Sequence, residues 1–501
     1  MSSPDQDEAK PSSGVPLFLC FVVVLVVGAT AFFTGRSRPD DREIRSSSAK
    51  PVTADKRGAE LARTLCASCH LEPAPAVSTR DRWALEILPA KADLLGFGAA
   101  TNATVISSRD WSAVCNHYLA QAPNAFPETK EREHPTSERF KAVVMNHPTA
   151  TRMTMGRIDP TGGVIYVGNA DDRSIDVIAP DGRLLTARPM PQIPLAAAPT
   201  DDGIFVALGS LDEESEGGVV FVGKPGSGNP ELQVLAEGLA RPVDLAVGNL
   251  DQDGRREVMV ATADGLLLLQ EGRPIALATN ASYRAVVIAD LNEDHRADVL
   301  AIRSGQQILE AHLSQGGGSF TTTNYVQQHP AWHFSDLAVS PLKRGEPIRI
   351  ITSNGNDGRI RRHVLPRIPD HGVFVWAPGK SGKKRLAALQ NAHRMVARDF
   401  DGDEDLDIVA IGYSGDHRVA ADHGAVYLEQ QRDRSFRVYR LPQSADARWS
   451  DVDAGDVDQD GDPDIVITAF HPGAGNAPEA RLKQWDQSPT TCLLLLNQTI
   501  P

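Results

Sequence analysis

Aromatic residues and cysteines are scarce in this sequence, and basic residues form no extended cluster. Aromatic residues make up 6% of the 501 residues, whereas 41 glycines and 34 prolines are present. Acidic residues outnumber basic ones, 65 against 51, which gives a formal net charge of −14. Proteins that bind nucleic acid carry a positive stripe for the phosphates. The composition therefore argues against a nucleic-acid partner, and the length allows two or three domains.

The five cysteines are too few and too scattered for a disulfide framework. Two of them form the motif Cys66-Ala67-Ser68-Cys69-His70. This spacing is typical of haem c attachment, in which both thiols bond to the haem vinyl groups and the imidazole binds the iron. A zinc site would need a second pair of ligands nearby, and a redox dithiol would follow a strand rather than a helical pattern. The motif therefore predicts one covalent haem with His70 as its proximal ligand.

One apolar run without charge occupies residues 15–33. At a rise of ~1.5 Å per residue, a helix of this length spans a hydrocarbon core of ~30 Å. The alternative is a cleaved signal peptide, because Ala29-Thr30-Ala31 resembles a cleavage site. Residues 1–14, however, carry three acids and a single lysine, unlike a signal peptide. The sequence therefore favours a retained single-pass anchor preceded by a cytoplasmic tail.

The orientation signals around this run conflict. Four arginines follow it, and the positive-inside tendency would keep that side in the cytoplasm. Covalent haem attachment resembles periplasmic c-type maturation, which requires the opposite orientation. The haem motif is the more specific signal, so we expect an inner-membrane anchor with the bulk of the chain in the periplasm. The four arginines are Arg36, Arg38, Arg42 and Arg45.

Residues 55–123 are predicted to form a small helical domain between two polar linkers, residues 34–54 and 124–138. Leu61, Leu65 and Cys69 recur at helical spacing, which indicates a helix that delivers the cysteines to the haem. A second helix is expected to begin after Ser107, with Asp110 completing a capping box. Both helices flank the motif-bearing turn.

Residues 139–501 contain repeats. Four segments share an apolar strand, a nine-residue acidic loop and a second apolar strand, with loops beginning at Asn249, Asp290, Asp399 and Asp456. The interval between the middle two loops is about twice a repeat, which predicts a degenerate unit at residues 334–353. Strand-like residues 162–168 and 203–209 predict two more units. Seven units of about 50 residues are typical of an all-β propeller with seven blades of four strands.

The acidic loops are predicted calcium sites. Carboxylates at positions 1, 3, 5 and 9, a carbonyl at position 7 and glycine at position 6 follow the logic of an EF-hand loop, although strands rather than helices flank them. Glu404 and His295 replace the glycine in two loops. Two to four Ca²⁺ are expected, in a structural role that pins the blade hairpins. The predicted ligands are Asn249, Asp251, Asp253 and Glu257; Asp290, Asn292, Asp294 and Asp298; Asp399, Asp401, Asp403, Asp405 and Asp407; and Asp456, Asp458, Asp460, Asp462 and Asp464.

These loops resemble the FG-GAP/VCBS repeats of integrin-α-like propellers, and the flanking helices resemble those of class I cytochrome c domains. Their combination resembles a family of secreted or membrane-anchored bacterial proteins common in planctomycete-like genomes. The resemblance rests on CASCHLEP, WALEILP, DW…HYLAQAP, SNGNDG and ARDFDGDEDLDIVAI. It implies a multidomain chain with a transmembrane helix, an all-α cytochrome domain and a propeller. It also implies electron transfer combined with calcium or glycan-related binding.

The sixth haem ligand is left open by the absence of methionine from residues 55–123. In the family the distal methionine tends to follow Leu-Pro-x, where this sequence has Lys91. A lysine binds iron only when deprotonated, against a free pKa of ~10.4 that burial would lower. The alternatives are an open or water-ligated site, Met145, or His117. We expect His117 at the surface, because it projects away from the apolar stripe of its helix.

The first functional hypothesis is an electron carrier whose calcium-stabilised propeller docks a ligand or partner. Its redox partner protein is unidentified, and a glycan or protein is the expected ligand of the propeller. The second is an enzyme whose propeller channel oxidises a sugar or alcohol and passes electrons to the haem. The third is an adhesion or glycan-binding protein with a sensor haem. The sequence shows no nucleophile constellation or quinone-cofactor signature, which favours the carrier over the enzyme.

Overall fold

The computed structural model describes most of the chain from Lys56 to Thr499. The described residues are 56–66, 72–92, 95, 106–125, 134–211, 215–224, 231–270, 273–328, 333–341, 345–355, 371–377, 382–413, 424–471 and 477–499. The predicted anchor at residues 15–33 and the predicted tail and linker beside it lie outside them. Within these ranges, no helix is both long and apolar enough to cross a membrane.

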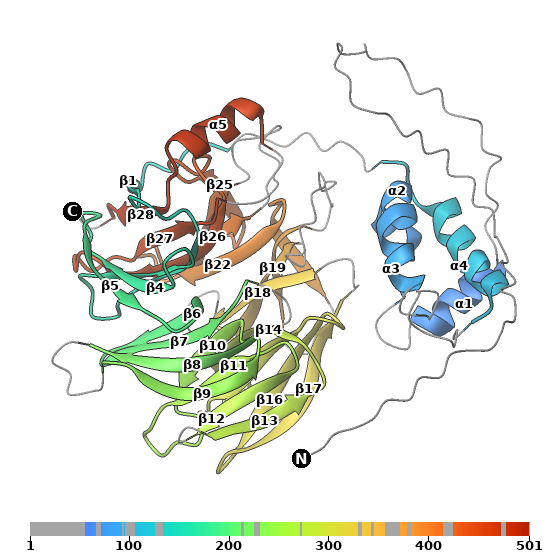
Figure 1. The fold of residues 1–501 in the computed structure, drawn as a ribbon, viewed down its shortest axis with the longest axis horizontal. Coiled ribbons are helices and arrows are strands. Elements are labelled where there is room, and N and C mark those ends of the chain that lie inside the picture. The colour runs from blue at the N-terminus through green and yellow to red at the C-terminus, as the bar shows by residue number, and fades with distance from the viewer. Residues whose placement is uncertain are drawn as a thin grey trace, which may run out of the picture. The chain divides into compact units, whose positions relative to one another are not determined.

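Residues 140–497 form seven four-stranded antiparallel sheets, the blades of a propeller (Figure 1). Blades 1–3 are β2 (Met153–Ile158), β3 (Ile165–Asn169), β4 (Ser174–Ile178) and β5 (Leu184–Pro189); β6 (Ile193–Thr200), β7 (Gly203–Gly209), β8 (Glu216–Gly223) and β9 (Gln233–Ala240); and β10 (Asp244–Gly248), β11 (Glu257–Ala261), β12 (Gly265–Gln270) and β13 (Arg273–Thr279). Each blade pairs consecutive strands, as expected for repeats of one hairpin-rich unit.

Blades 4–6 continue this pattern around the ring. They are β14 (Tyr283–Ala289), β15 (Asp298–Arg303), β16 (Ile308–Gly316) and β17 (Ser319–Gln327); β18 (His333–Pro341), β19 (Ile348–Gly355), β20 (Gly372–Trp376) and β21 (Lys383–Ala387); and β22 (Ala392–Arg398), β23 (Asp407–Gly412), β24 (Ala425–Gln430) and β25 (Phe436–Arg440). Blade 5 is the predicted degenerate unit. The seven-repeat prediction is therefore confirmed, including both units inferred before Asn249.

Blade 7 is built from both ends of the propeller. β26 (Trp449–Gly455), β27 (Asp464–Ala469) and β28 (Cys492–Asn497) come from the C-terminal end, and β1 (Phe140–Met145) pairs antiparallel with β28. The two strands lie side by side in Figure 1. A helix, α5 (Glu479–Gln487), separates β27 from β28. Neither this closure nor α5 is predicted by a pattern in the sequence.

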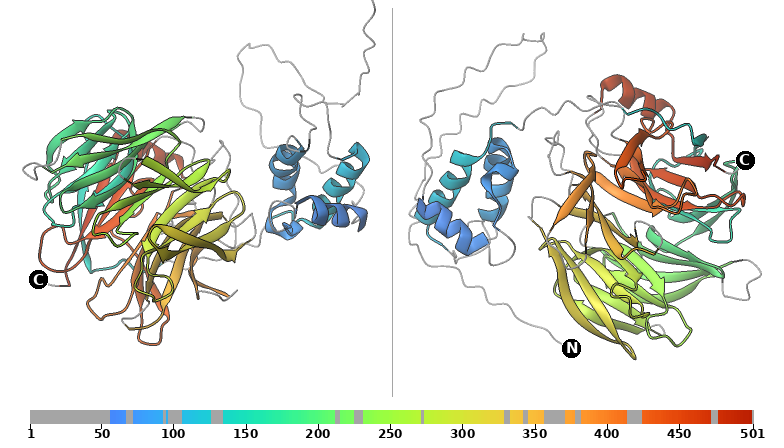
Figure 2. Two further views of the ribbon diagram at one scale, coloured as in Figure 1. Left: turned by 90° about the horizontal axis from the view of Figure 1, so that it is seen from below. Right: turned by 180° about the vertical axis from the view of Figure 1, so that it is seen from behind.

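The core lies between the blades, which follow one another around a central axis (Figure 2). Second strands such as β23 and β27 are buried along their whole length. Strands covered on both faces form continuous apolar runs instead of an alternating pattern. Between blades 6 and 7, Phe400, Tyr427 and Trp449 are completely buried in one apolar cluster. This packing holds the first strands of the blades around the axis.

Charged side chains from the first strands meet across that axis. Arg394 of blade 6 pairs with Asp336 of blade 5 at 3.3 Å, with Asp451 of blade 7 at 3.7 Å and with Asp244 of blade 3 at 3.9 Å. Arg157 of blade 1 also pairs with Asp451. Burial raises the pKa of Asp244 to about 6. Because blades 3 and 6 lie across the ring from each other, this network spans the central channel.

The N-terminal helical unit consists of α1 (Lys56–Cys66), a 3-10 turn (Pro75–Val77), α2 (Arg80–Arg82), a π-helical segment (Trp83–Ile87), α3 (Leu88–Ala92) and α4 (Ser108–Gln121). As predicted, Ser107 caps α4: its Oγ accepts a hydrogen bond from the Asp110 amide at 3.1 Å and donates one to the Asp110 carboxylate at 2.9 Å. Trp83 stacks on Tyr118 with ring centroids 4.2 Å apart. These rings form the centre of the unit's small core.

The predicted surface position of His117 is wrong. His117 is 8% exposed, because α1 crosses α4 closely at Gly58. A Cβ at Gly58 would lie 2.0 Å from the Ala113 carbonyl oxygen and 3.0 Å from the His117 Cβ. The His117 Nδ1 lies 2.8 Å from the Gln121 Nε2. The helical pattern placed His117 off the apolar stripe, but a glycine on a neighbouring helix brings that helix over it.

Candidate cation sites in the acidic loops

The four acidic loops join the first and second strands of blades 3, 4, 6 and 7 and share one conformation. Each has a left-handed residue at position 4 and another at position 6. The φ angles are 66° at Gln252, 64° at Glu293, 78° at Gly402 and 65° at Gln459, and 87° at Gly254, 64° at His295, 68° at Glu404 and 100° at Gly461. Left-handed backbone costs a residue with a Cβ roughly 1 kcal/mol. The loops that lack the predicted glycine therefore keep the turn, at the expense of local strain.

The acid at position 9 of each loop is buried and ties the hairpin together. Its carboxylate accepts a hydrogen bond from the amide of the residue at position 2, as in Asp464 with Val457 at 2.9 Å. In three loops the other carboxylate oxygen accepts a hydrogen bond from a backbone amide in or beside the third strand of the blade. In blade 7 this donor is the Asn497 amide, at 2.8 Å from Asp464. Burial raises the pKa of both Asp407 and Asp464 to about 7. The four acids are Glu257, Asp298, Asp407 and Asp464.

Three of the loops gather carboxylates whose oxygens lie within 4.8 Å of one another. The groups are Asp251, Asp253 and Glu257; Asp399, Asp401 and Asp403; and Asp456, Asp458 and Asp464. Among the described residues, the loop of Asp290 and Asn292 forms no such group. Both Asp290 oxygens accept backbone amides, at 3.1 Å from Asp294 and 2.8 Å from His295. Two other predicted ligands, Asn249 and Asp460, belong to none of the three groups. Asn249 is exposed, and the Asp460 carboxylate accepts a hydrogen bond from the Asp462 amide at 3.1 Å.

Position 7 divides the loops into two pairs. In blades 3 and 4 it is an arginine that pairs with the acid at position 5: Arg255 lies 3.8 Å from Asp253, and Arg296 lies 3.9 Å from Asp294. In blades 6 and 7 it is a buried aspartate, Asp405 at 6% and Asp462 at 3% exposure. An arginine supplies its own positive charge, whereas a buried carboxylate adds to the repulsion. The first pair of loops is therefore partly neutralised from within.

Two carboxylate oxygens in the second pair of loops are buried without a hydrogen bond. They are Asp405 Oδ1 and Asp456 Oδ1. Burial raises the pKa of Asp405 to about 6. A buried carboxylate oxygen without a donor is costly in the charged state. Hard divalent cations accept several carboxylate oxygens at once, so the donor set of loops 399–407 and 456–464 fits Ca²⁺.

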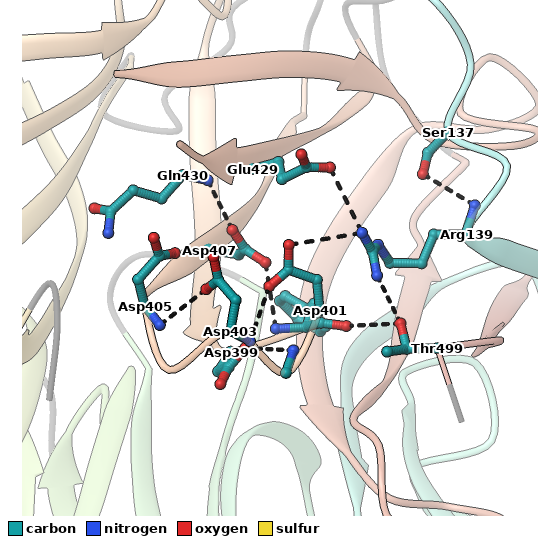
Figure 3. Close-up of polar contacts among 12 residues, drawn as sticks. Ser137, Arg139, Asp399, Asp401, Asp403, Asp405, Asp407, Glu429, Gln430 and Thr499 are labelled. Carbon is teal, nitrogen blue, oxygen red and sulfur yellow. Dashed lines mark hydrogen bonds and ion pairs between the residues drawn. The ribbon is translucent and has the colours of Figure 1, made fainter. Parts of the chain in front are cut away.

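The loop at 399–407 contacts residues from distant parts of the chain (Figure 3). Arg139, just before β1, lies 3.7 Å from both Asp401 and Glu429 of β24, and it donates to the Thr499 hydroxyl at 2.6 Å. Asp401, Asp403 and Glu429 also line a cavity of about 480 Å³ beside the β24–β25 hairpin. Sequence reasoning missed Arg139 and Glu429, because no local pattern connects them with the loop.

The predicted haem residues are only partly described. Cys66 is the last residue of α1, while Cys69 and His70 lie outside the described residues. Lys91 is exposed on α3. Met145, another candidate ligand, is 4% exposed in the propeller core, where it packs with Ile178 and Leu494.

The model of the FG-GAP-like repeat family matches residues 399–467, from the acidic loop of blade 6 through β27 of blade 7. The chain therefore contains an FG-GAP-like repeat within a seven-bladed propeller. No curated protein matches the chain.

Among solved structures, the chain is similar to the Pan2 WD40 domain of Neurospora crassa, with 13% identity, 72% of this chain and 96% of that chain covered, and a TM-score of 0.45. It is also similar to the RRP9 WD40 repeats, at 10% identity, 73% and 100% coverage and a TM-score of 0.44. A third is the calcium-binding protein regucalcin from Agrobacterium tumefaciens, at 10% identity, 72% and 94% coverage and a TM-score of 0.34. At these values the similarities say nothing about ligands.

Proposed function

We propose that this chain is a membrane-anchored c-type cytochrome that carries electrons outside the cytoplasm, with a calcium-stabilised propeller that docks its partner or ligand. The observation that carries the proposal is the motif Cys66-Ala67-Ser68-Cys69-His70, whose first cysteine is the last residue of α1. Covalent haem would be held by both thiols, and His70 would bind the iron. The haem supplies one-electron chemistry when bound. The residues around it would fix its orientation and limit the access of water.

The small core of the helical unit supports a bound prosthetic group. Among the residues that the structure describes, its cluster has six buried members, which are Ala62, Trp83, Leu88, Val114, Tyr118 and Ala122. Apolar residues from the helices stay partly exposed around it, among them Leu61, Leu65 and Leu119, and Leu85 is 77% exposed. Domains this small usually need disulfides, a metal or a cofactor to become stable. A haem against these side chains would supply the missing apolar contacts.

The distribution of charge supports calcium binding at two of the loops. Loops 399–407 and 456–464 have buried aspartates at position 7 and unpaired buried oxygens, whereas Arg255 and Arg296 partly neutralise the other two loops. We therefore expect two Ca²⁺ per chain rather than four. Their role would be to offset carboxylate repulsion and hold the hairpins of blades 6 and 7.

The charged network across the channel disfavours the enzyme alternative. Arg394 and its three aspartate partners cross the channel in which the enzyme alternative would bind its substrate. Each of these aspartates also accepts an amide of a neighbouring blade, as Asp244 does from Val286 at 3.0 Å. Groups that hold blades together cannot rearrange for catalysis without loosening the ring. A docking role leaves this network undisturbed.

The test is to express the full chain in a host with c-type cytochrome maturation and purify it in detergent. We expect a mass increase of one haem, a c-type pyridine haemochrome spectrum, and about two Ca²⁺ per chain by elemental analysis. A Cys69→Ser variant should retain the calcium and lose the normal haem spectrum. A wild-type protein without covalent haem would refute the cytochrome proposal. Reduction of the haem by a sugar, without an added partner, would favour the enzyme alternative.

A further inference from the structure

Arg139 brings a positive charge to the loop 399–407. Its guanidinium lies 3.7 Å from Asp401, which stands at position 3 of the loop, and 3.7 Å from Glu429. The three side chains are 23%, 16% and 20% exposed, so water screens these contacts only in part. Figure 3 shows the guanidinium between the two carboxylates and Thr499. In blade 7, by contrast, no described basic side chain pairs with Asp456, Asp458 or Asp464.

Arg139 ends a short segment, residues 135–139, which we call the strap. The strap lies beside Arg440, the last residue of β25 in blade 6. The Arg440 amide donates to the Pro135 carbonyl at 2.9 Å, and the Ser137 amide donates to the Arg440 carbonyl at 2.9 Å. The Arg440 guanidinium also donates to the Thr136 hydroxyl at 2.9 Å. Residues 135–138 of the strap are also the last residues of the predicted linker, residues 124–138. The strap therefore attaches the end of that linker to the propeller.

The same carboxylate therefore serves two purposes. Asp401 pairs with Arg139, and it also belongs to the group of oxygens, with Asp399 and Asp403, that fits a divalent cation. Ca²⁺ binds oxygen ligands at 2.3–2.6 Å and carries twice the charge of a guanidinium. A cation at this point would draw the Asp401 carboxylate inward and repel the guanidinium beside it.

We propose that Arg139 and a divalent cation compete for Asp401, so that cation binding at loop 399–407 weakens the attachment of the strap to blade 6. The inference rests on the proposed calcium site of this loop. It adds that occupancy of this site controls how firmly the linker is attached to blade 6. By linkage, the strap lowers the affinity for the cation by the same factor by which the cation loosens the strap.

The consequence is a linker whose free length depends on the cation. Release of the five strap residues adds up to about 17 Å of reach, at ~3.4 Å per extended residue. The residues before the strap lead to the helical unit. Cation occupancy would thus set how many residues of the chain before β1 are held by blade 6. The loop at 456–464 would bind its cation without this effect.

The experiment measures both sides of the competition in the full, detergent-purified chain. Hydrogen exchange reports the strap through the Ser137 and Arg440 amides, and calorimetry reports calcium binding. An Asp456→Asn background removes the second site, so that only loop 399–407 titrates. We expect calcium to lower the protection of both amides about tenfold, and Arg139→Gln to raise calcium affinity about tenfold.

Matched variants separate the competition from a general loss of structure. Arg437→Gln removes another arginine, whose guanidinium lies over the Tyr439 ring at 5.0 Å, and should leave the affinity unchanged. Arg139→Lys keeps a positive charge and should give an intermediate affinity. Calcium binding that leaves the Ser137 and Arg440 amides equally or better protected would overturn the competition and spare the proposed site. Absence of calcium binding at loop 399–407 would overturn both.

Discussion

The buried Asp464 predicts that calcium and protons compete to stabilise the propeller. Asp464 is fully buried, and burial raises its pKa from 3.8 to about 7. A raised folded-state pKa gives stability that is complete below the unfolded pKa and is lost as the pH rises through the folded one. Without calcium, the contribution of this residue to the free energy of unfolding therefore falls as the pH rises from about 4 to about 7.

The magnitude follows from the pKa difference. At about 1.4 kcal/mol per unit, Asp464 costs the calcium-free protein about 2.5 kcal/mol more at pH ~7.5 than at pH ~5. A bound Ca²⁺ favours the ionised carboxylate and offsets this cost. Free calcium at about 100 times its dissociation constant adds about 2.7 kcal/mol to the free energy of unfolding. Calcium should therefore stabilise the propeller strongly at pH ~7.5 and weakly at pH ~5.

Urea unfolding, followed by tryptophan fluorescence with calcium or with a chelator, measures this effect. The buried Trp376 and Trp449 report the propeller. The Asp464→Asn variant keeps the shape of the side chain but cannot ionise, so the chelated variant should lack the 2.5 kcal/mol dependence on pH. Equal calcium stabilisation at both pH values, or parallel pH profiles for variant and wild type, would refute the reasoning.

Three further predictions concern other parts of the chain. Asp458→Asn should reduce bound calcium by one ion per chain in elemental analysis, whereas Asp251→Asn should leave the content unchanged. Gly58→Ala places a Cβ 2.0 Å from a backbone oxygen of α4 and should destabilise the helical unit by about 2 kcal/mol or more in thermal melts followed by circular dichroism, whereas Gly305→Ala, in open space, should not. Arg394→Met removes the guanidinium partner of the buried Asp244 and Asp336 and should cost about 3–5 kcal/mol in urea unfolding at pH 7.

The architecture of the propeller could be predicted because its information is local. Each unit repeats an apolar strand, a turn and a second strand, so the period remained visible even in blade 5, which lacks an acidic loop. The conformation of the loops was also local, since the Asp and Asn side chains accept backbone amides within each loop. Even the loops with Glu404 and His295 adopt the same turn.

What the sequence did not predict depends on contacts between distant residues. The pairing of Phe140 with Asn497 joins positions at opposite ends of the propeller, and no periodicity connects them. Arg139 reaches Asp401 only because that closure places it there. His117 was misplaced for the same reason, because its burial depends on Gly58 of another helix. The haem motif and the sixth ligand remain predictions from the sequence.

The two loops best suited to calcium flank the point where the ring closes. Joining β1 to β28 brings together residues more than 300 positions apart, and such long loops are costly in entropy to close. Asn497, at the end of β28, donates to the Phe400 carbonyl of one loop at 2.8 Å and to the Pro463 carbonyl of the other at 3.1 Å. The backbone amide of Asn497 donates a hydrogen bond to the Asp464 carboxylate. A cation in loop 456–464 would therefore stabilise the closure, which is the part of the propeller that chain connectivity supports least.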